Sequence, residues 1–330
     1  MLIIAIIIIN YNNYKGETMN KLNKIGLTAL AGALAATSAQ AVEMSVSGSA
    51  SINYATSDTT EVTGNKVSMG DSLTFSGSGE TDQGWTVSAS IEVDGGTYDD
   101  RSVTIDMGDS GKVHVQDSGA QGTGADLVGA AYGSAGYSLV SASTTGKHVI
   151  DGLDSGAGTV NLGYTTSVAG FDVGLGYTPG GTGGKGSSTA VSVKYADLVE
   201  GLTLAAGMSD RNTSAANGTS ERSISASYAV GGATIGYTDY ASDDDTASGT
   251  DYDSRHYGVS FAVNDDLTIS YDKSISDKSN AAVDEEITSW QASYTMGSMT
   301  IKGHVSSADN EQFSSGAEDE AKAIDVSWSF

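Results

Sequence analysis

Cysteine is absent from this chain of 330 residues, and basic residues are scarce. Without thiols the chain can form no disulfide and offers no thiolate nucleophile, and with only four histidines we expect no zinc site. The 16 lysines and arginines stand against 41 aspartates and glutamates, a formal charge of −25. Because such a chain repels nucleic acid, we expect no DNA or RNA partner.

Leucine-rich helical stretches are also missing after the first forty residues. Glycine, serine, threonine and small apolar residues dominate instead, and this composition favours an all-β protein. The hydrophobic fraction of 38% is low for a single soluble core of this length. The apolar residues are nevertheless regularly placed, which argues against a disordered chain.

The start of the chain carries the pattern of a secretory signal peptide. From Met19 a basic region with Lys21 and Lys24 leads into an apolar stretch that ends at Ala39-Gln40-Ala41. We predict a signal peptide over residues 19–41, with Ala39 and Ala41 at the cleavage site. The apolar stretch is shorter than the ~20 residues of a membrane-spanning helix.

Residues 1–18 are rich in Ile, Asn and Tyr, and we interpret them as upstream DNA read in frame, with Met19 as the true start. The mature chain is then residues 42–330. Its charge is −27, because removal of residues 1–41 takes away three lysines and one glutamate.

From residue 43 onward, apolar and polar residues alternate in short segments. In the first segment Met44, Val46 and Ile52 lie on one face, and serines lie on the other. A period of two predicts β-strands with one apolar face. The pattern repeats about sixteen times in strands of roughly 9–11 residues, the length that crosses a bilayer at a tilt. Tight Gly/Asn/Asp turns are expected to alternate strictly with longer polar loops.

An even number of strands with all tight turns at one end is the plan of an outer-membrane barrel, with short periplasmic turns and longer external loops. Backbone groups in lipid must pair within the sheet, so the last strand must meet the first. The final segment, "KAIDVSWSF", fits this requirement because Trp328 and Phe330 share its apolar face at an interface with water. We therefore predict an all-β fold, a 16-stranded antiparallel transmembrane β-barrel.

Two other classes stay open on the sequence. A secreted acidic β-rich adhesin or layer protein would show the same alternation, but it would be stable in water without detergent. An enzymatic barrel would need a nucleophile, a base and an orienting group at one rim, and no histidine lies in such a motif. We expect no enzymatic activity.

The chain resembles the Gram-negative general porins, particularly those of alphaproteobacteria. The resemblance rests on "GFDVGLGYTP", "EGLTLAAGMS", "YGVSFAVNDDLTISYDKS" and the terminal Phe330, and it extends from about Val42 to Phe330. It implies a homotrimer in the outer-membrane lipid that passes ions and small hydrophilic solutes by diffusion. It also implies that the barrel-assembly machinery recognises the last strand through Trp328 and Phe330.

One long connection interrupts the pattern, from about Asp117 to Gly158. Long loops in compact structures are usually functional, and in porins of this type the loop after the fifth strand folds inward and narrows the channel. We predict such an inward-folded constriction loop here. Two alternatives stay open: an ordinary solvated external loop, or a short strand within "YGSAGYSLVSAS", which would change the strand count.

The constriction is predicted to combine acidic loop residues with charged wall residues. The loop carboxylates are Asp117, Asp126, Asp151 and Asp154. Alternation places on the inner wall Glu92, Asp106, Lys112, His114, Gln116, Lys194, Asp272, Lys302, His304 and Asp325. Lys112 and His114 are expected to face the loop carboxylates. Since rings of carboxylates favour cations, we predict a modest cation preference.

The sequence indicates no cofactor and no strong metal site. The run Asp243-Asp244-Asp245 offers oxygen ligands that would bind calcium weakly. Small outward residues on the early strands, Gly48, Ala50, Gly77 and Ala89, would suit a contact with another protein better than with lipid.

Overall fold

The computed structural model describes residues 43–57, 66–116, 161–180, 186–196, 198–214, 217–246 and 249–330. Residues 43–330 form one compact unit. The leader over residues 1–18, the signal peptide over 19–41 and its cleavage residues Ala39 and Ala41 lie outside the described part and stay predictions. In the described ranges no helix is long and apolar enough to cross a membrane.

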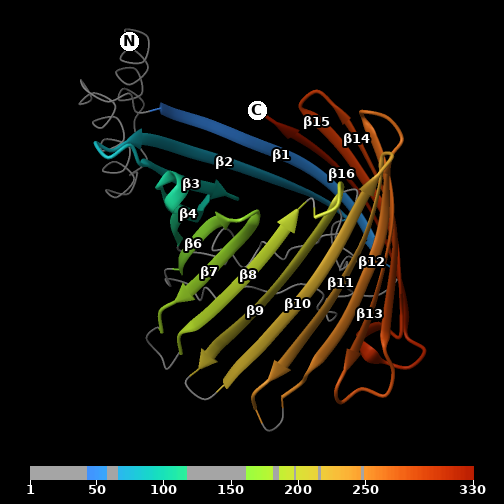
Figure 1. Ribbon diagram of the computed structural model, residues 1–330. Coiled ribbons are helices and arrows are strands. Elements are labelled where there is room, and N and C mark those ends of the chain that lie inside the picture. Colours follow the sequence, from blue (N-terminus) through green and yellow to red (C-terminus); the bar gives the residue numbers. More distant parts are fainter. Residues whose placement is uncertain are drawn as a thin grey trace, which may run out of the picture. The chain divides into compact units, whose positions relative to one another are not determined.

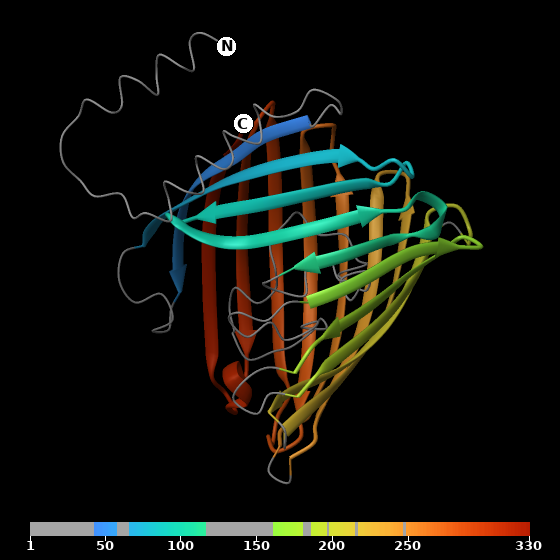
Figure 2. The same cartoon turned by 90° about the vertical axis from the view of Figure 1, so that its left-hand side faces the viewer.

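Sixteen strands make up the unit (Figures 1 and 2). They are β1 (Glu43–Ser57), β2 (Val67–Glu80), β3 (Thr86–Asp94), β4 (Thr97–Asp106), β5 (Lys112–Gln116), β6 (Asn161–Val168), β7 (Phe171–Thr178), β8 (Ser188–Ala196), β9 (Leu202–Ser214), β10 (Asn217–Val230), β11 (Ala233–Asp244), β12 (Tyr252–Ala262), β13 (Leu267–Lys278), β14 (Glu285–Met296), β15 (Met299–Asp309) and β16 (Glu318–Ser329). Two short 3₁₀ turns, η2 (Gly108–Ser110) and η5 (Glu311–Phe313), lie in connections.

The strands close into one antiparallel barrel in which each strand pairs with its neighbours in the chain. The predicted fold class, with its sixteen strands, is therefore confirmed. One end of the barrel, called the turn end below, carries the β2–β3, β4–β5, β6–β7, β8–β9, β10–β11, β12–β13 and β14–β15 connections and the end of β16. The opposite end, called the loop end, carries the remaining connections.

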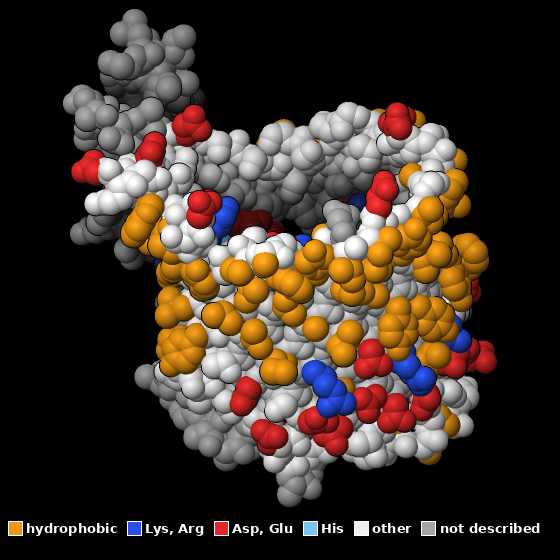
Figure 3. Space-filling model, in the orientation of Figure 1, with side chains coloured by type: hydrophobic (Ala, Val, Ile, Leu, Met, Phe, Trp, Pro, Cys, Tyr) orange, Lys and Arg blue, Asp and Glu red, His pale blue; other side chains and the backbone are white. Residues whose placement is uncertain are grey.

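The apolar and polar residues that alternate along each strand lie in turn on the outer and the inner face of the barrel. On β1 and β2, for example, Val46 lies beside Phe75 and Ile52 beside Met69, and all four side chains are on the outer face. Figure 3 shows the result as a belt of hydrophobic side chains around the visible wall, bordered toward the loop end by acidic and basic residues. An apolar outer belt of this kind is the surface that a transmembrane barrel presents to lipid.

Closure of the barrel follows the prediction that the last strand meets the first. β16 pairs with β1 along nine positions, with Trp328 opposite Ala50 and Val326 opposite Ile52. Two more backbone hydrogen bonds extend the pairing to the last residue: the N–H of Gly48 donates to the carbonyl of Phe330 (2.8 Å), and the N–H of Phe330 donates to Gly48 (2.9 Å). No edge is therefore left open at this seam.

Two predictions from the sequence were wrong, one about the length of the strands and one about the alternation of turns and loops. Strand length runs from 5 residues in β5 to 15 in β1 instead of staying at roughly 9–11. Turns and loops do not alternate strictly either. At the loop end β3 and β4 are joined by Gly95 and Gly96 alone, and only two residues separate β9 from β10. Most of "DRNTSAANGTSE", which reads as a polar loop, extends the β9–β10 hairpin past the apolar belt.

Candidate functional site

The inner face of the barrel is lined by polar and charged side chains. The strand registers place on this face Glu92, Asp106, Lys112, His114, Gln116, Lys194, Asp272, Lys302, His304 and Asp325, the set selected from the sequence. The loop residues Asp117, Asp126, Asp151 and Asp154 lie outside the described residues. Their place in a constriction, and the contribution of the wall residues to selectivity, stay predictions.

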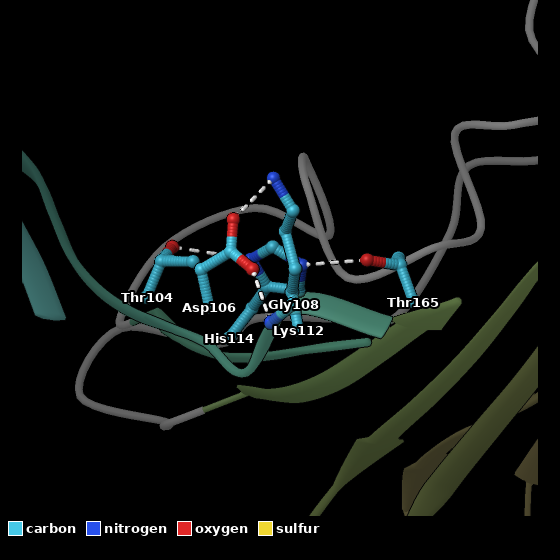
Figure 4. A network of polar contacts seen from close by, with 6 residues as sticks. All are labelled: Thr104, Asp106, Gly108, Lys112, His114 and Thr165. Atoms are coloured by element: carbon cyan, nitrogen blue, oxygen red, sulfur yellow. Dashed lines mark hydrogen bonds and ion pairs between the residues drawn. The ribbon is translucent and has the colours of Figure 1, made fainter. Parts of the chain in front are cut away.

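Lys112 and Asp106 form an ion pair at the turn end of the wall (Figure 4). The two residues are opposite each other on β4 and β5, and the Lys112 Nζ lies 2.8 Å from the Asp106 Oδ2. The other carboxylate oxygen accepts a hydrogen bond from the N–H of Gly108 at 3.0 Å. About half of the Lys112 side chain is exposed. From the sequence we predicted that Lys112 faces the loop carboxylates. In the structure its partner is a carboxylate on the neighbouring strand.

His114 joins three strands of the inner wall (Figure 4). One ring nitrogen, Nδ1, lies 3.2 Å from the Thr104 Oγ1 on β4, and Nε2 lies 3.0 Å from the Thr165 Oγ1 on β6. A ring held from both sides has little rotational freedom. His114 therefore serves as a fixed polar part of the wall beside the pair Asp106–Lys112.

Other lysines near the turn end also have acidic neighbours. The Lys194 Nζ lies 3.8 Å from the Asp172 Oδ2, and the same carboxylate group accepts a hydrogen bond from the Ser167 hydroxyl (2.6 Å). Lys302 is directly opposite Asp325 in the β15–β16 register. Asp172 was not among the residues selected from the sequence, although the alternation in "GFDVGLGYT" already places it opposite the apolar face.

Deeper in the barrel the acidic residues contact neutral side chains. The Gln291 amide donates a hydrogen bond to the Asp272 Oδ2, and the Ser72 hydroxyl donates one to the Glu92 Oε1. Each of these hydrogen bonds is 2.5 Å long. Toward the loop end the Glu221 carboxylate accepts hydrogen bonds from the Tyr240 and Ser209 hydroxyls, each 2.9 Å long. Glu221 is a further wall residue that the alternation of β10 would have revealed.

Acidic groups outnumber basic groups among the described inward side chains of β3 to β16. The acidic residues are Glu92, Asp94, Asp106, Asp172, Glu221, Asp244, Asp272, Glu285, Asp319 and Asp325, and the lysines are Lys112, Lys194, Lys278 and Lys302. Because the lysines near the turn end each lie beside a carboxylate, the excess of charge along the wall is negative.

Several charged residues on the outer face form ion pairs toward the loop end. Arg222 lies 3.6 Å from Asp243 and 3.9 Å from Asp253, and the Lys322 Nζ lies 2.8 Å from the Glu320 Oε1. Within the described ranges no group of three or more acidic or histidine side chains is arranged to hold a metal ion. Weak calcium binding by the acidic loops stays a prediction.

Comparison with known proteins gives a family and a fold. The family model for Gram-negative porins matches residues 26–329. None of the curated proteins compared with the chain matches it. The structure superposes on a porin solved at 1.8 Å resolution with a TM-score of 0.66 and 18% identity, covering 87% of this chain and 100% of that one.

Two further solved structures are similar. An anion-selective porin from Comamonas acidovorans gives a TM-score of 0.66 at 15% identity and covers 88% of this chain and 100% of its own. OmpT from Vibrio cholerae gives 0.65 at 14% identity and covers 88% of this chain and 98% of its own. At these identities the likeness concerns the fold, and it extends over the whole barrel.

Proposed function

Because the chain belongs to the Gram-negative porin family, we propose that it forms a water-filled channel through which ions and small hydrophilic solutes diffuse, with a modest preference for cations. The protein is an outer-membrane porin and not an enzyme, as its family and its closed barrel establish. The outer apolar belt around a polar interior does not favour the adhesin considered from the sequence.

The cation preference is supported by the excess of carboxylates on the inner wall. The fold alone does not set the sign of selectivity, since a structure with the same fold belongs to an anion-selective porin. The wall charges must decide it. In this chain the lysines near the turn end are matched by Asp106, Asp172 and Asp325, while Glu92 adds negative charge further along the wall. Carboxylates that line a pore favour cations.

We further propose that three copies assemble side by side and that the end of β16 directs assembly of the barrel. Ala50, Gly77 and Ala89 are small residues on the outer faces of β1, β2 and β3, and they would let a neighbouring wall approach closely. Gly48 has a different role, because the ring of Phe330 already lies over it.

The proposed channel is tested by reconstituting residues 42–330 in a planar bilayer under a salt gradient. We expect stepwise conductance, with steps in groups of three, and a reversal potential on the cation side. A reversal potential of the opposite sign would keep the channel but refute the cation preference. Protein that stays folded in plain buffer and never inserts would refute the channel.

Replacing Asp106 with asparagine should shift the reversal potential toward anions. The carboxylate beside Lys112 lies in a water-filled wall, so we expect a small effect, about twofold or less in the cation-to-anion permeability ratio. The Asp71→Asn variant is the control, since it removes the same charge from the outer face. Equal shifts in both variants would show that Asp106 acts only through the net charge of the protein.

A further inference from the structure

The connection between β15 and β16 turns into the mouth of the barrel. It holds Phe313 between inward-facing residues of two other strands: the ring centroids of Phe313 and Tyr252 are 5.9 Å apart, and the Lys278 Nζ lies 5.4 Å from the Phe313 centroid. Tyr252 and Lys278 are opposite each other on β12 and β13, on the inner face. Only 8% of Phe313 is exposed, so this ring is packed against the wall at the loop end.

Hydrogen bonds fix the same segment, residues 310–317, to the wall. The N–H of Gln312 donates to the Glu285 Oε1 at 2.8 Å, and Glu285 is an inward residue at the start of β14. The Asn310 side-chain amide donates to the carbonyl of Asp284 at 2.9 Å, while its oxygen accepts the N–H of Gly316 at 3.0 Å. The segment is therefore attached across β12, β13 and β14 as well as to its own two strands.

The backbone of this segment is held in an unfavourable conformation. Asn310, Gln312 and Phe313 have φ angles of 55°, 54° and 60°, in the left-handed region that non-glycine residues seldom adopt. Such angles persist only where surrounding contacts impose them, and they are common at functional segments. The contacts of Phe313 and Gln312 with the inner wall are among those that hold this backbone, together with hydrogen bonds inside the segment such as Glu311 N–H to the Ala317 carbonyl.

A small apolar patch of the inner wall lies next to the segment, beside the polar residues that contact it. Ile287, Ala308 and Ala321 face inward on β14, β15 and β16, and they form a cluster in which no side chain is more than 5% exposed. In a water-filled barrel, inward apolar side chains that no other part of the protein covers would be exposed to water. Burial of these three side chains indicates that protein covers this part of the mouth.

We propose that residues 310–317 form a fixed narrowing element at the loop end of the channel, which limits the size of the hydrophilic solutes that enter. Phe313 is the positioning residue that keeps the segment turned inward. The proposal rests on the channel function proposed above. It adds a selectivity element carried entirely by described residues, separate from the predicted constriction loop.

The test compares solute uptake by vesicles that contain the wild type or the Phe313→Ala variant. Uptake of neutral sugars of increasing size is followed by vesicle swelling, together with single-channel conductance. We expect the variant to conduct more and to admit large sugars at a rate closer to that of small ones. Phe313→Leu should retain most of the discrimination because it keeps an apolar side chain. Phe171→Ala is the matched control, since its ring packs on Tyr195 on the outer face at the turn end.

A second pair of variants addresses the hydrogen bond from Gln312. Glu285→Leu removes the acceptor and should change uptake in the same direction as Phe313→Ala. Glu285→Gln keeps an acceptor oxygen and should resemble the wild type. Unchanged conductance and size discrimination in folded Phe313→Ala and Glu285→Leu would overturn the narrowing element while leaving the channel intact. A wild type without channel activity would instead overturn the proposed function.

The inward position can also be checked without conduction. Because the chain has no cysteine, single cysteines report their own exposure to a maleimide added from outside. Ala308→Cys, at a position of the inner wall that is 1% exposed, should react slowly, and Ser315→Cys, at an exposed position of the segment, should react rapidly. Equal rates at the two positions would show that the segment does not turn inward, and this result would overturn the proposal.

Discussion

Replacing Gly48 with valine should weaken the seam between β1 and β16 that closes the barrel. Gly48 lies on the outer face of β1, where its backbone exchanges two hydrogen bonds with Phe330. A β-carbon at this position would lie 2.6 Å from the Phe330 Cε2 and 2.8 Å from the Leu73 Cδ2. Valine is a better strand former than glycine, so local preference opposes the expected loss. Overpacking of this kind costs about 1–3 kcal/mol, and we expect a cost at the lower end here, because the ends of the Phe330 and Leu73 side chains can rotate away.

The measurement is refolding into detergent micelles, with the folded fraction read from heat-modifiable migration and the free energy of unfolding from urea titration. Gly77→Val is the matched control: Gly77 is on the outer face of the adjacent strand, and its nearest atoms would be 3.8 Å from an added β-carbon. Gly48→Ala should also cost less in a chain that carries Phe330→Ala, because the ring is then absent. Equal behaviour of the Gly48 and Gly77 variants would refute the role of Phe330 at the seam.

The barrel could be predicted because its main determinants are local. A period of two identifies which residues face lipid without any knowledge of their partners. Residues such as Ile324 and Trp328 therefore have assigned faces before the strands are paired. Closure then follows from the requirement that backbone groups in lipid be paired. The lengths of the strands were harder to predict. The β9–β10 hairpin continues in polar residues past the apolar belt, and nothing in the alternation of its sequence marks where the strands end.

The contacts of the site depended on register, which the sequence indicates only weakly. Alternation put Lys112 and Lys194 on the inner wall, but their partners Asp106 and Asp172 are set by which residues lie opposite each other across two turns. The inward turn of residues 310–317 was missed for a related reason. Its sequence is polar and reads as a solvated loop, and only the wall formed by Tyr252, Lys278 and Glu285 gives Phe313 a place inside.

Replacing Gly201 with alanine should destabilise the barrel more than the same change at Gly232. Both glycines end a turn and have nearly equal φ angles, 81° and 82°. Each carbonyl accepts a hydrogen bond from the next hairpin, from the N–H of Ala229 and of Ala262 respectively, at 2.9 Å. The two sites differ in space: an added β-carbon would lie 2.3 Å from the Ala229 carbonyl oxygen at Gly201, but 3.6 Å from that of Ala262 at Gly232.

The conformational cost of alanine at these angles, about 1–2 kcal/mol, is common to both variants and cancels in their comparison. The clash at Gly201 is with backbone, which cannot rotate away as a side chain can, so Gly201→Ala should lose about 1–3 kcal/mol more. Urea unfolding in the same detergent gives both values. Equal losses would mean that β10 moves away from the β8–β9 turn at little cost. A larger loss at Gly201 would show that the turn end is packed backbone against backbone, so that the spacing of neighbouring hairpins there depends on glycine.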